Sequence, residues 1–204
     1  MTQETELKPA YAERIGKQIE QLLKQSCLRP LIIGIDGRCA SGKTTLAHSL
    51  HERYGWDVVH ADDFFLRPQQ RTPERYAEPG GNLDRERLIE EVLMPLRQNR
   101  PVVFQRFDCS IMKLNEQITL KPTDAVIVEG SYALHPSLRE YYDLKIFMDA
   151  EYEEQLRRIE HRSGKAKLEQ FKTRWIPLEE TYFESCGVKE CADICINSSF
   201  PEGF

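Results

Sequence analysis

Apolar runs and amphipathic stretches alternate along most of this chain. Short runs rich in β-branched residues predict buried strands, which lie at residues 31–36, 56–61, 125–128, 144–149 and 192–196. An apolar stripe at helical spacing precedes the first strand, at Tyr11, Ile15, Ile19, Leu22 and Leu23. Strands separated by helices form a parallel sheet with helices on both faces. The pattern therefore predicts a doubly wound α/β fold, with the first helix packed on the domain rather than on a partner.

Two other features interrupt the alternation. Two strand-like patterns lie close together within residues 101–121 and predict a small β-hairpin. A loop rich in Pro and Gly precedes the hairpin at residues 68–81, and Asp84 is placed to cap a helix that runs through Leu96. The sequence shows no internal repeat and no low-complexity segment.

Composition narrows the class of protein. The length of 204 residues suits one domain (1–204), with the N-terminal helix inside residues 1–28. The net charge of −5 argues against nucleic acid as the main partner, because phosphate backbones select basic surfaces. No apolar run approaches the roughly 18 residues of a membrane span, and the acidic start is unlike a signal peptide. We expect a cytoplasmic protein with no membrane partner, and a homo-oligomer remains open.

The cysteines predict no metal site. The six of them, at positions 27, 39, 109, 186, 191 and 195, form no C-x-x-C pair. We expect reduced thiols rather than a zinc site. Cys39 has two interpretations: a thiol whose pKa is lowered by a nearby helix N-terminus, or, as we favour, a small residue that fits its loop.

The run from Gly37 to Thr44 matches the P-loop template G-x-x-x-x-G-K-[ST] at every fixed position. A predicted strand precedes it and a predicted helix follows it, so backbone N–H groups can surround an anion at a helix N-terminus. Lys43 is then expected to reach the β- and γ-phosphates of a nucleotide, and the Thr44 hydroxyl to bind Mg²⁺. The motif predicts a nucleotide-binding set of Gly37, Ala40, Ser41, Gly42, Lys43, Thr44 and Thr45.

Three predicted strands run into carboxylates. Asp36 leads into the P-loop. Asp62 and Asp63 follow the second strand, and Glu129 ends the third. Each acid alone is equally well explained as a helix cap or turn residue, but ligands of such sheets bind at the carboxyl ends of the strands. Glu129 and Asp62 can therefore hold Mg²⁺ beside Thr44, and one of Asp62 and Asp63 can deprotonate an attacking hydroxyl.

Together these motifs resemble those of the uridine kinase and phosphoribulokinase group. The resemblance rests on residues 37–45, 62–65, 129–136 and 157–162 and spans residues 30–197. Nicotinamide riboside kinases, which are related to this group, carry a similar Asp-Asp-Phe-Phe after the second strand. The resemblance implies a P-loop kinase fold, ATP and Mg²⁺ as cofactors, and transfer of the γ-phosphoryl group of ATP to a hydroxyl of a small, often ribose-bearing metabolite.

The resemblance also assigns roles by position. Asp62 matches the catalytic base of the family. Asp84 matches its ribose-binding aspartate in one alignment and is only a helix cap in another. The acceptor is expected to contact Asp84, Arg106, Phe107, Asp108 and Tyr132.

An arginine-rich stretch indicates a lid. Arg158 and Arg162 are four residues apart, so on a helix they share one face. With Arg157 they resemble lid arginines, which stabilise the charge that develops on the transferring phosphoryl group. The alternative is a solvated face paired with Glu153, Glu154 and Glu160. We favour a helical lid over residues 153–172, and we predict as catalytic residues Lys43, Asp62, Arg158 and Arg162.

One departure of this sequence from the family pattern concerns recognition of the acceptor. In pyrimidine nucleoside kinases of this group the hairpin carries a histidine that helps to read the base. Met112 takes its place here, so the resemblance covers catalysis but not base recognition. We predict a uridine kinase-like ATP:alcohol phosphotransferase with a nucleoside as the favoured acceptor. The alternatives are a kinase of nicotinamide riboside, a sugar phosphate or pantothenate, and a P-loop NTP-binding regulator that hydrolyses slowly.

Overall fold

A five-stranded parallel sheet forms the centre of the computed structural model, which describes residues 4–28, 30–121 and 123–200. Its strand order is β2-β5-β1-β6-β7. The strands are β1 (Leu31–Gly37), β2 (Asp57–His60), β5 (Ala125–Glu129), β6 (Leu144–Asp149) and β7 (Ile194–Asn197). All of the predicted core strands are present, and the expected doubly wound α/β fold is confirmed.

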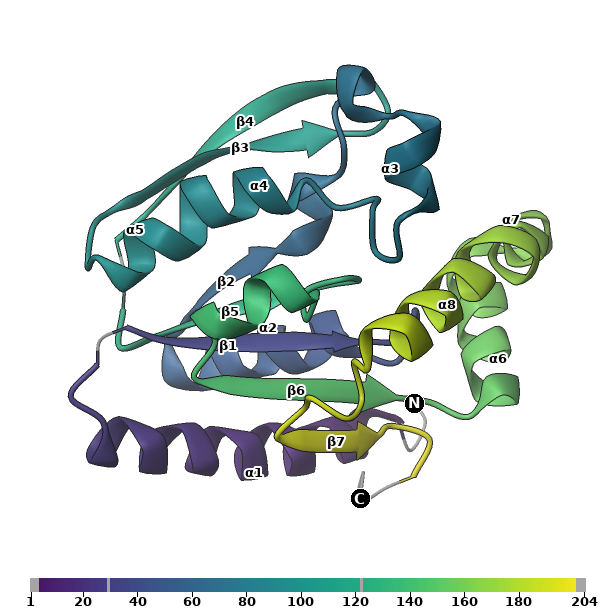
Figure 1. The fold of residues 1–204 in the computed structure, drawn as a ribbon. Helices are drawn as coiled ribbons and strands as arrows, with labels where there is room; N and C mark the ends of the chain where they lie inside the picture. The colour runs from purple at the N-terminus through teal and green to yellow at the C-terminus, as the bar shows by residue number, and fades with distance from the viewer. Residues whose placement is uncertain (1–3, 29, 122, 201–204) are drawn as a thin grey trace.

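Helices cover both faces of the sheet (Figure 1). One face carries α1 (Glu4–Gln25) and α2 (Lys43–Tyr54). The other carries the helix formed by α4 (Arg85–Leu88), a π-helical segment (Ile89–Leu93) and α5 (Met94–Arg97). The C-terminal helices are α6 (Tyr152–Ser163), α7 (Lys165–Gln170), a π-helical segment (Phe171–Trp175) and α8 (Ile176–Cys186).

The alternation of side chains along β1 explains the two layers. Ile33 and Ile35 are buried with α1 and α2, whereas Ile32, which points to the other face of the strand, is buried with the opposite helices. Every β1 residue is buried, as expected for a parallel strand covered on both faces. Ile15 and Ile19 of α1 are fully buried in the first layer, which agrees with the predicted packing of this helix on the domain.

The predicted hairpin consists of β3 (Val102–Asp108) and β4 (Lys113–Leu120), paired antiparallel. It lies above α4 and α5 at the top of Figure 1. The predicted loop at 68–81 is partly helical, with a 3₁₀ turn (Pro68–Gln70) and α3 (Pro73–Ala77). Two further 3₁₀ segments follow strands, Ala61–Phe64 after β2 and Pro136–Tyr141 after the β5 loop.

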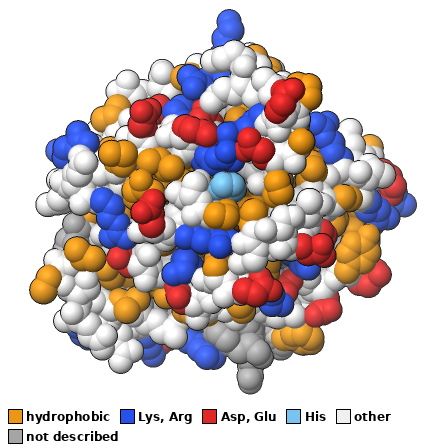
Figure 2. All heavy atoms as spheres, in the orientation of Figure 1, with side chains coloured by type: hydrophobic (Ala, Val, Ile, Leu, Met, Phe, Trp, Pro, Cys, Tyr) orange, Lys and Arg blue, Asp and Glu red, His pale blue; other side chains and the backbone are white. Residues whose placement is uncertain are grey.

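Residues 1–3 of the predicted N-terminal helix and the last four residues of the predicted domain lie outside the described residues. Within the described part of the chain, no helix combines the length and the apolar character needed to span a membrane. On the face that Figure 2 shows, acidic and basic side chains are intermixed.

Candidate active site

The P-loop joins β1 to α2 at the carboxyl edge of the sheet. Gly37 has a φ of +135°, and a Cβ on it would lie 2.0 Å from the Met148 carbonyl oxygen, so no larger residue fits. Gly42 precedes α2 with a φ of 92° and offers no side-chain cap, which leaves the first N–H groups of the helix for a ligand. The Ser41 hydroxyl is buried and has no hydrogen-bond partner among the described residues. This loop fits a nucleotide phosphate.

Lys43 and Thr44 lie at the start of α2, close to the acidic strand ends. Lys43 is 8% exposed, and its Nζ donates hydrogen bonds to the carbonyl oxygens of Gly37 (2.7 Å) and Arg38 (2.8 Å). The Thr44 hydroxyl lies 3.2 Å from both carboxylate oxygens of Glu129. Hydroxyl and carboxylate oxygens are the ligands that Mg²⁺ prefers, usually with phosphate oxygens and waters completing the shell. The pair therefore fits Mg²⁺.

Asp62 and Asp63 face different surroundings although they are adjacent. Asp62 lines the cavity beside the P-loop, where desolvation raises the pKa of its carboxyl and Lys43 opposes the shift. Asp63 lies outside the cavity wall, 3.2 Å from Nε of Arg106 on the hairpin. A hydroxyl bound in the cavity can therefore reach Asp62, and the choice of Asp62 as the base stays a prediction.

His60, at the end of β2, also contacts this acidic group. Its Nδ1 lies 2.6 Å from Glu129 Oε1, and this hydrogen bond raises the pKa of the imidazole. Sequence reasoning did not single out His60. Among the described residues, no cluster of three or more His, Cys, Asp or Glu side chains could hold a metal by itself.

One cavity of about 900 Å³ joins these groups. Its wall contains most of the predicted nucleotide-binding and catalytic residues, namely Ala40, Ser41, Gly42, Lys43, Thr44, Thr45, Asp62, Glu129, Arg158 and Arg162. On the other side, the wall continues to the hairpin turn and to the loop after β2. The residues predicted to bind phosphate and those of the hairpin turn therefore border one continuous space.

The sequence matches the model of the phosphoribulokinase/uridine kinase family over residues 32–165. The chain belongs to this family. A uridine kinase of Staphylococcus carnosus is 33% identical over 189 residues, covering 84% of this chain and 87% of that protein. One from Macrococcus caseolyticus is 32% identical, with coverage of 84% and 88%. The structure of a "possible uridine kinase" from Bacillus stearothermophilus shares the fold, with a TM-score of 0.63, 21% identity, and coverage of 89% of this chain and 98% of that one.

The arginines of this family member take three different positions. Arg158 donates to the carbonyl oxygens of Ala40 (3.3 Å) and Ser198 (2.8 Å), so it is fastened beside the P-loop. Arg162 lines the cavity with its guanidinium 5.9 Å from the Phe171 ring centroid. Arg157 is exposed and pairs with Glu154, as the solvated-face alternative expected. Sequence analysis missed Arg174, a cavity residue on the π-helical segment before α8.

Fewer of the residues predicted to bind the acceptor line the cavity. Tyr132 lines the cavity, and so does Met112, which lies in the hairpin turn with a φ of 55°. Arg106, Phe107 and Asp108 are not among the residues that line the cavity: Arg106 pairs with Asp63, Phe107 is buried, and Asp108 bonds Ser110. Cys109 and Arg71, which sequence reasoning did not select, stand at the cavity surface instead.

Asp84 caps α4, as one of the two interpretations expected. Its carboxylate accepts from the Arg87 N–H at 3.2 Å and is fully buried. The second carboxylate oxygen lies 3.3 Å from Nε of Arg67. The structure does not bring Asp84 to the cavity wall, whereas its neighbour Asn82 does line it. A ribose contact through Asp84 stays a prediction.

Two buried carboxylates that sequence reasoning left without a role hold the P-loop in shape. Asp36 accepts hydrogen bonds from Gly37 N–H (2.7 Å), Leu134 N–H (2.8 Å) and the Tyr182 hydroxyl (2.8 Å). Burial raises its pKa to about 6. Glu179 of α8 accepts from the Cys39 N–H at 2.9 Å. No motif marks Glu179, because its role depends on how α8 packs.

The interpretation of Cys39 as a low-pKa thiol is wrong. Burial, followed by the nearby Glu179 carboxylate, raises the pKa of this thiol to about 12. Gln155 donates to its sulfur at 3.1 Å. Cys39 is therefore the small, inert loop residue that we favoured.

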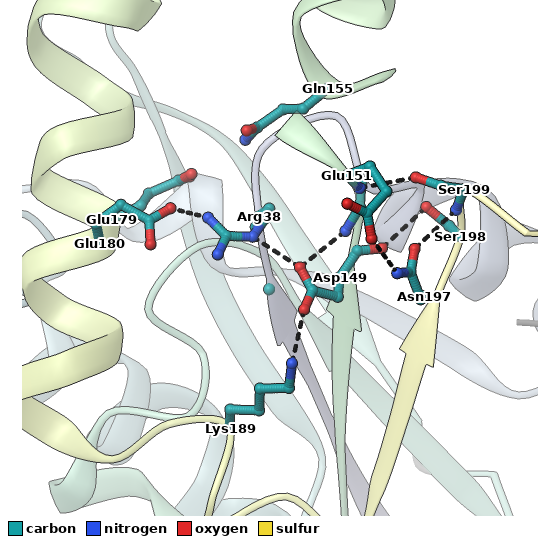
Figure 3. Close-up of polar contacts among 12 residues, drawn as sticks. Arg38, Asp149, Glu151, Gln155, Glu179, Glu180, Lys189, Asn197, Ser198 and Ser199 are labelled. Atoms are coloured by element: carbon teal, nitrogen blue, oxygen red, sulfur yellow. Dashed lines mark hydrogen bonds and ion pairs between the residues drawn. The ribbon is translucent and has the colours of Figure 1, made fainter. Parts of the chain in front are cut away.

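Arg38 ties the loop to the C-terminal helices. Figure 3 shows its guanidinium between Glu180 of α8 and Asp149 at the end of β6. Lys189 binds the second oxygen of Asp149 at 2.9 Å. Although Arg38 is a variable position of the motif, it is a structural residue here.

Proposed function

We propose that this kinase transfers the γ-phosphoryl group of ATP, with Mg²⁺, to a hydroxyl of a small metabolite, with a nucleoside as the favoured acceptor. The observation that carries the proposal is the convergence of Lys43, the Thr44–Glu129 pair and Asp62 on one cavity. We place the activity in the cytoplasm, where free cysteines such as the six found here are kept reduced.

The side chains divide the work. Lys43 supplies positive charge to the β- and γ-phosphates, while Thr44 and Glu129 hold Mg²⁺, which neutralises charge on the phosphate oxygens. Asp62 accepts the proton of the acceptor hydroxyl, a role that its raised pKa suits because a carboxylate with a higher pKa is a stronger base. Arg158 and Arg162 stabilise the charge that develops on the transferring group and help to exclude water.

The relatives named uridine kinase support a nucleoside acceptor. A second candidate, an alcohol other than uridine or cytidine, is favoured by Met112 in the cavity wall. A thioether offers no donor for a pyrimidine and forms an adaptable apolar surface. Nicotinamide riboside, a sugar phosphate and pantothenate represent this class.

ADP formation in the presence of single acceptors tests the proposal. The screen uses nucleosides, sugar phosphates and vitamins with ATP and Mg²⁺, and Lys43→Ala measures the background. We expect at least one acceptor to raise ADP formation by about 10²-fold, because an enzyme that closes over its acceptor hydrolyses ATP poorly without it. Slow ATP hydrolysis that no acceptor accelerates favours an NTP-binding regulator instead.

A further inference from the structure

The acceptor side of the cavity contains one arginine that no motif assigns. This wall is mostly apolar: it includes Phe65, Leu66, Cys109 and Met112, with the polar side chains of Tyr76 and Asn82 and with Arg71. Arg71 lies in the loop between the 3₁₀ turn Pro68–Gln70 and α3, and it lines the same cavity as Arg158 and Arg162 of the C-terminal helices. Its surroundings differ from those of Lys43, Arg158 and Arg162, which stand beside the P-loop.

Contacts with its neighbours hold Arg71 in position but do not use all of its hydrogen-bond donors. Its Nε donates to the Leu66 carbonyl oxygen at 2.8 Å, and its guanidinium lies 5.6 Å from the centroid of the buried Phe107 ring. Among the described residues, no carboxylate lies within ion-pair distance of Arg71, and its guanidinium also hydrogen-bonds the Cys109 thiol. Guanidinium carries five N–H donors, so most of them remain available to a ligand.

The neighbouring arginines of the same loop are paired with carboxylates, whereas Arg71 is not. Arg67 lies 3.3 Å from Asp84, and Arg75 bonds both carboxylate oxygens of Glu86 at 2.8 Å. These two arginines hold the loop together. Arg71 is half-buried and has no such carboxylate among the described residues, so its charge is available to pair with an anionic ligand.

Arg71 also lies within electrostatic reach of the reaction centre. Burial raises the pKa of the Cys109 thiol in the hairpin turn; the Arg71 guanidinium opposes this shift, and the Asp62 carboxylate adds to it. One small molecule that fills the cavity can therefore present a hydroxyl to Asp62 and a second group to Arg71.

We propose that Arg71 binds an oxyanion of the acceptor, a carboxylate or a phosphate ester, at the end remote from the reacting hydroxyl. The inference rests on the proposed kinase function and favours, over an uncharged nucleoside, the anionic alcohols among its candidate acceptors, such as a sugar phosphate or pantothenate. Arg71 forms charge-assisted hydrogen bonds with the oxyanion, and its planar fork matches the two oxygens of a carboxylate or phosphate. The apolar wall around it lowers the local dielectric and strengthens the pair.

Matched pairs of acceptors test the site. Pantothenate and pantothenol differ at a carboxylate, and uridine 3′-monophosphate and uridine differ at a phosphate. Binding is measured by calorimetry with the protein saturated with a non-hydrolysable ATP analogue and Mg²⁺, and turnover is measured in parallel. We expect the anionic member of at least one pair to bind at least about tenfold more tightly, as a lost charge-assisted bond implies. The pair that shows the difference identifies carboxylate or phosphate as the ligand.

Variants separate the site from the fold. Arg71→Gln should abolish the preference for the anionic member, and Arg71→Lys should retain part of it. Arg67→Gln, on the same loop but outside the cavity wall, should leave the ratio unchanged. Equal binding of both members of each pair, including no binding by either, overturns the inference, as does an anion preference that survives Arg71→Gln. Failure of the kinase proposal has a different signature, ATP turnover that no acceptor stimulates.

Discussion

The two sides of the cavity are built in different ways. The phosphate side comes from one contiguous run, Gly37 to Thr45, supported by Glu129 on the neighbouring strand. The acceptor side is assembled from the segment after β2, the hairpin turn and the loop before α3. Local sequence therefore determines the first side, whereas the second depends on how distant segments pack.

This difference has a chemical consequence. The phosphate side offers backbone N–H groups and a fixed lysine, which recognise a feature common to all nucleoside triphosphates. The acceptor side offers side chains from exposed or loosely constrained positions, such as Cys109 and Met112. We therefore expect the phosphate side to determine the type of reaction. The choice of acceptor should depend on a few side chains of the acceptor side. The predictions below test that division.

The largest effect is expected on the phosphate side. Lys43→Ala removes a preorganised charge, so turnover should fall by about 10²- to 10³-fold and ATP affinity should weaken. The fold should persist, because Lys43 bonds only loop carbonyl oxygens. Steady-state kinetics, with circular dichroism to check folding, measures this. Wild-type turnover in the variant contradicts the P-loop assignment.

The adjacent aspartates separate chemistry from binding. Asp62→Asn keeps the shape of the side chain and removes the base, so transfer should fall by about 10²-fold while ATP affinity changes little. Asp63→Asn is the matched control, and its effect should be milder because Asp63 faces Arg106 outside the cavity. Calorimetry with ATP and Mg²⁺ beside a turnover assay decides between them. If Asp63→Asn is the more damaging change, the assignment of the base is wrong.

A smaller effect is expected from the acceptor side. Uridine and cytidine should show kcat/KM values at least about tenfold below that of the best acceptor, because Met112 supplies no hydrogen bond to a pyrimidine. Met112→His should narrow the gap. Steady-state kinetics with uridine, cytidine and nicotinamide riboside measures it. A wild-type kcat/KM near 10⁵ M⁻¹s⁻¹ for uridine, an ordinary enzymatic value, means that another group reads the base.

The smallest effect concerns His135, which lies outside the cavity wall and precedes the 3₁₀ segment Pro136–Tyr141. His135 stacks on Tyr182 and lies 3.4 Å from Arg85, and burial followed by Arg85 lowers its pKa from 6.5 to about 4. Between these pH values the unfolded chain binds more protons, so the folded state loses stability as the pH falls. With a discount for partial exposure, this amounts to about 1 kcal/mol.

The His135→Gln variant isolates the contribution of His135 to the pH dependence of stability. Asp36 titrates in the opposite sense, because its pKa is raised from 3.8 to about 6, so the difference between wild type and variant is measured rather than one curve. Urea unfolding at pH 7 and pH 4 should show that the stability advantage of the wild type shrinks by about 1 kcal/mol. A difference that does not change with pH contradicts the lowered pKa.

The contrast between the sides also explains what could be predicted from sequence. The strands, the hairpin and the P-loop follow from local patterns, and the structure confirms them. Glu179 and Arg71 gain their roles from packing, so no pattern marks them. Phe107 and Asp108 show the opposite error: the motif correctly located the hairpin, but the turn presents Cys109 and Met112 to the cavity instead. Cys109 and Met112 lie in the turn between β3 and β4, where the alternation of strand faces does not apply, so the strand pattern could not select them.

The fate of the γ-phosphate is the most direct test of the central claim, that the cavity joins an ATP site to an acceptor site. ATP labelled at the γ-phosphate is incubated with Mg²⁺, the wild type or Asp62→Asn, and the acceptor that gives the highest turnover. We expect the label to appear in a phosphate ester of the acceptor, and ester formation to fall by about 10²-fold in Asp62→Asn. Label released as inorganic phosphate at the same rate with and without acceptor contradicts the claim.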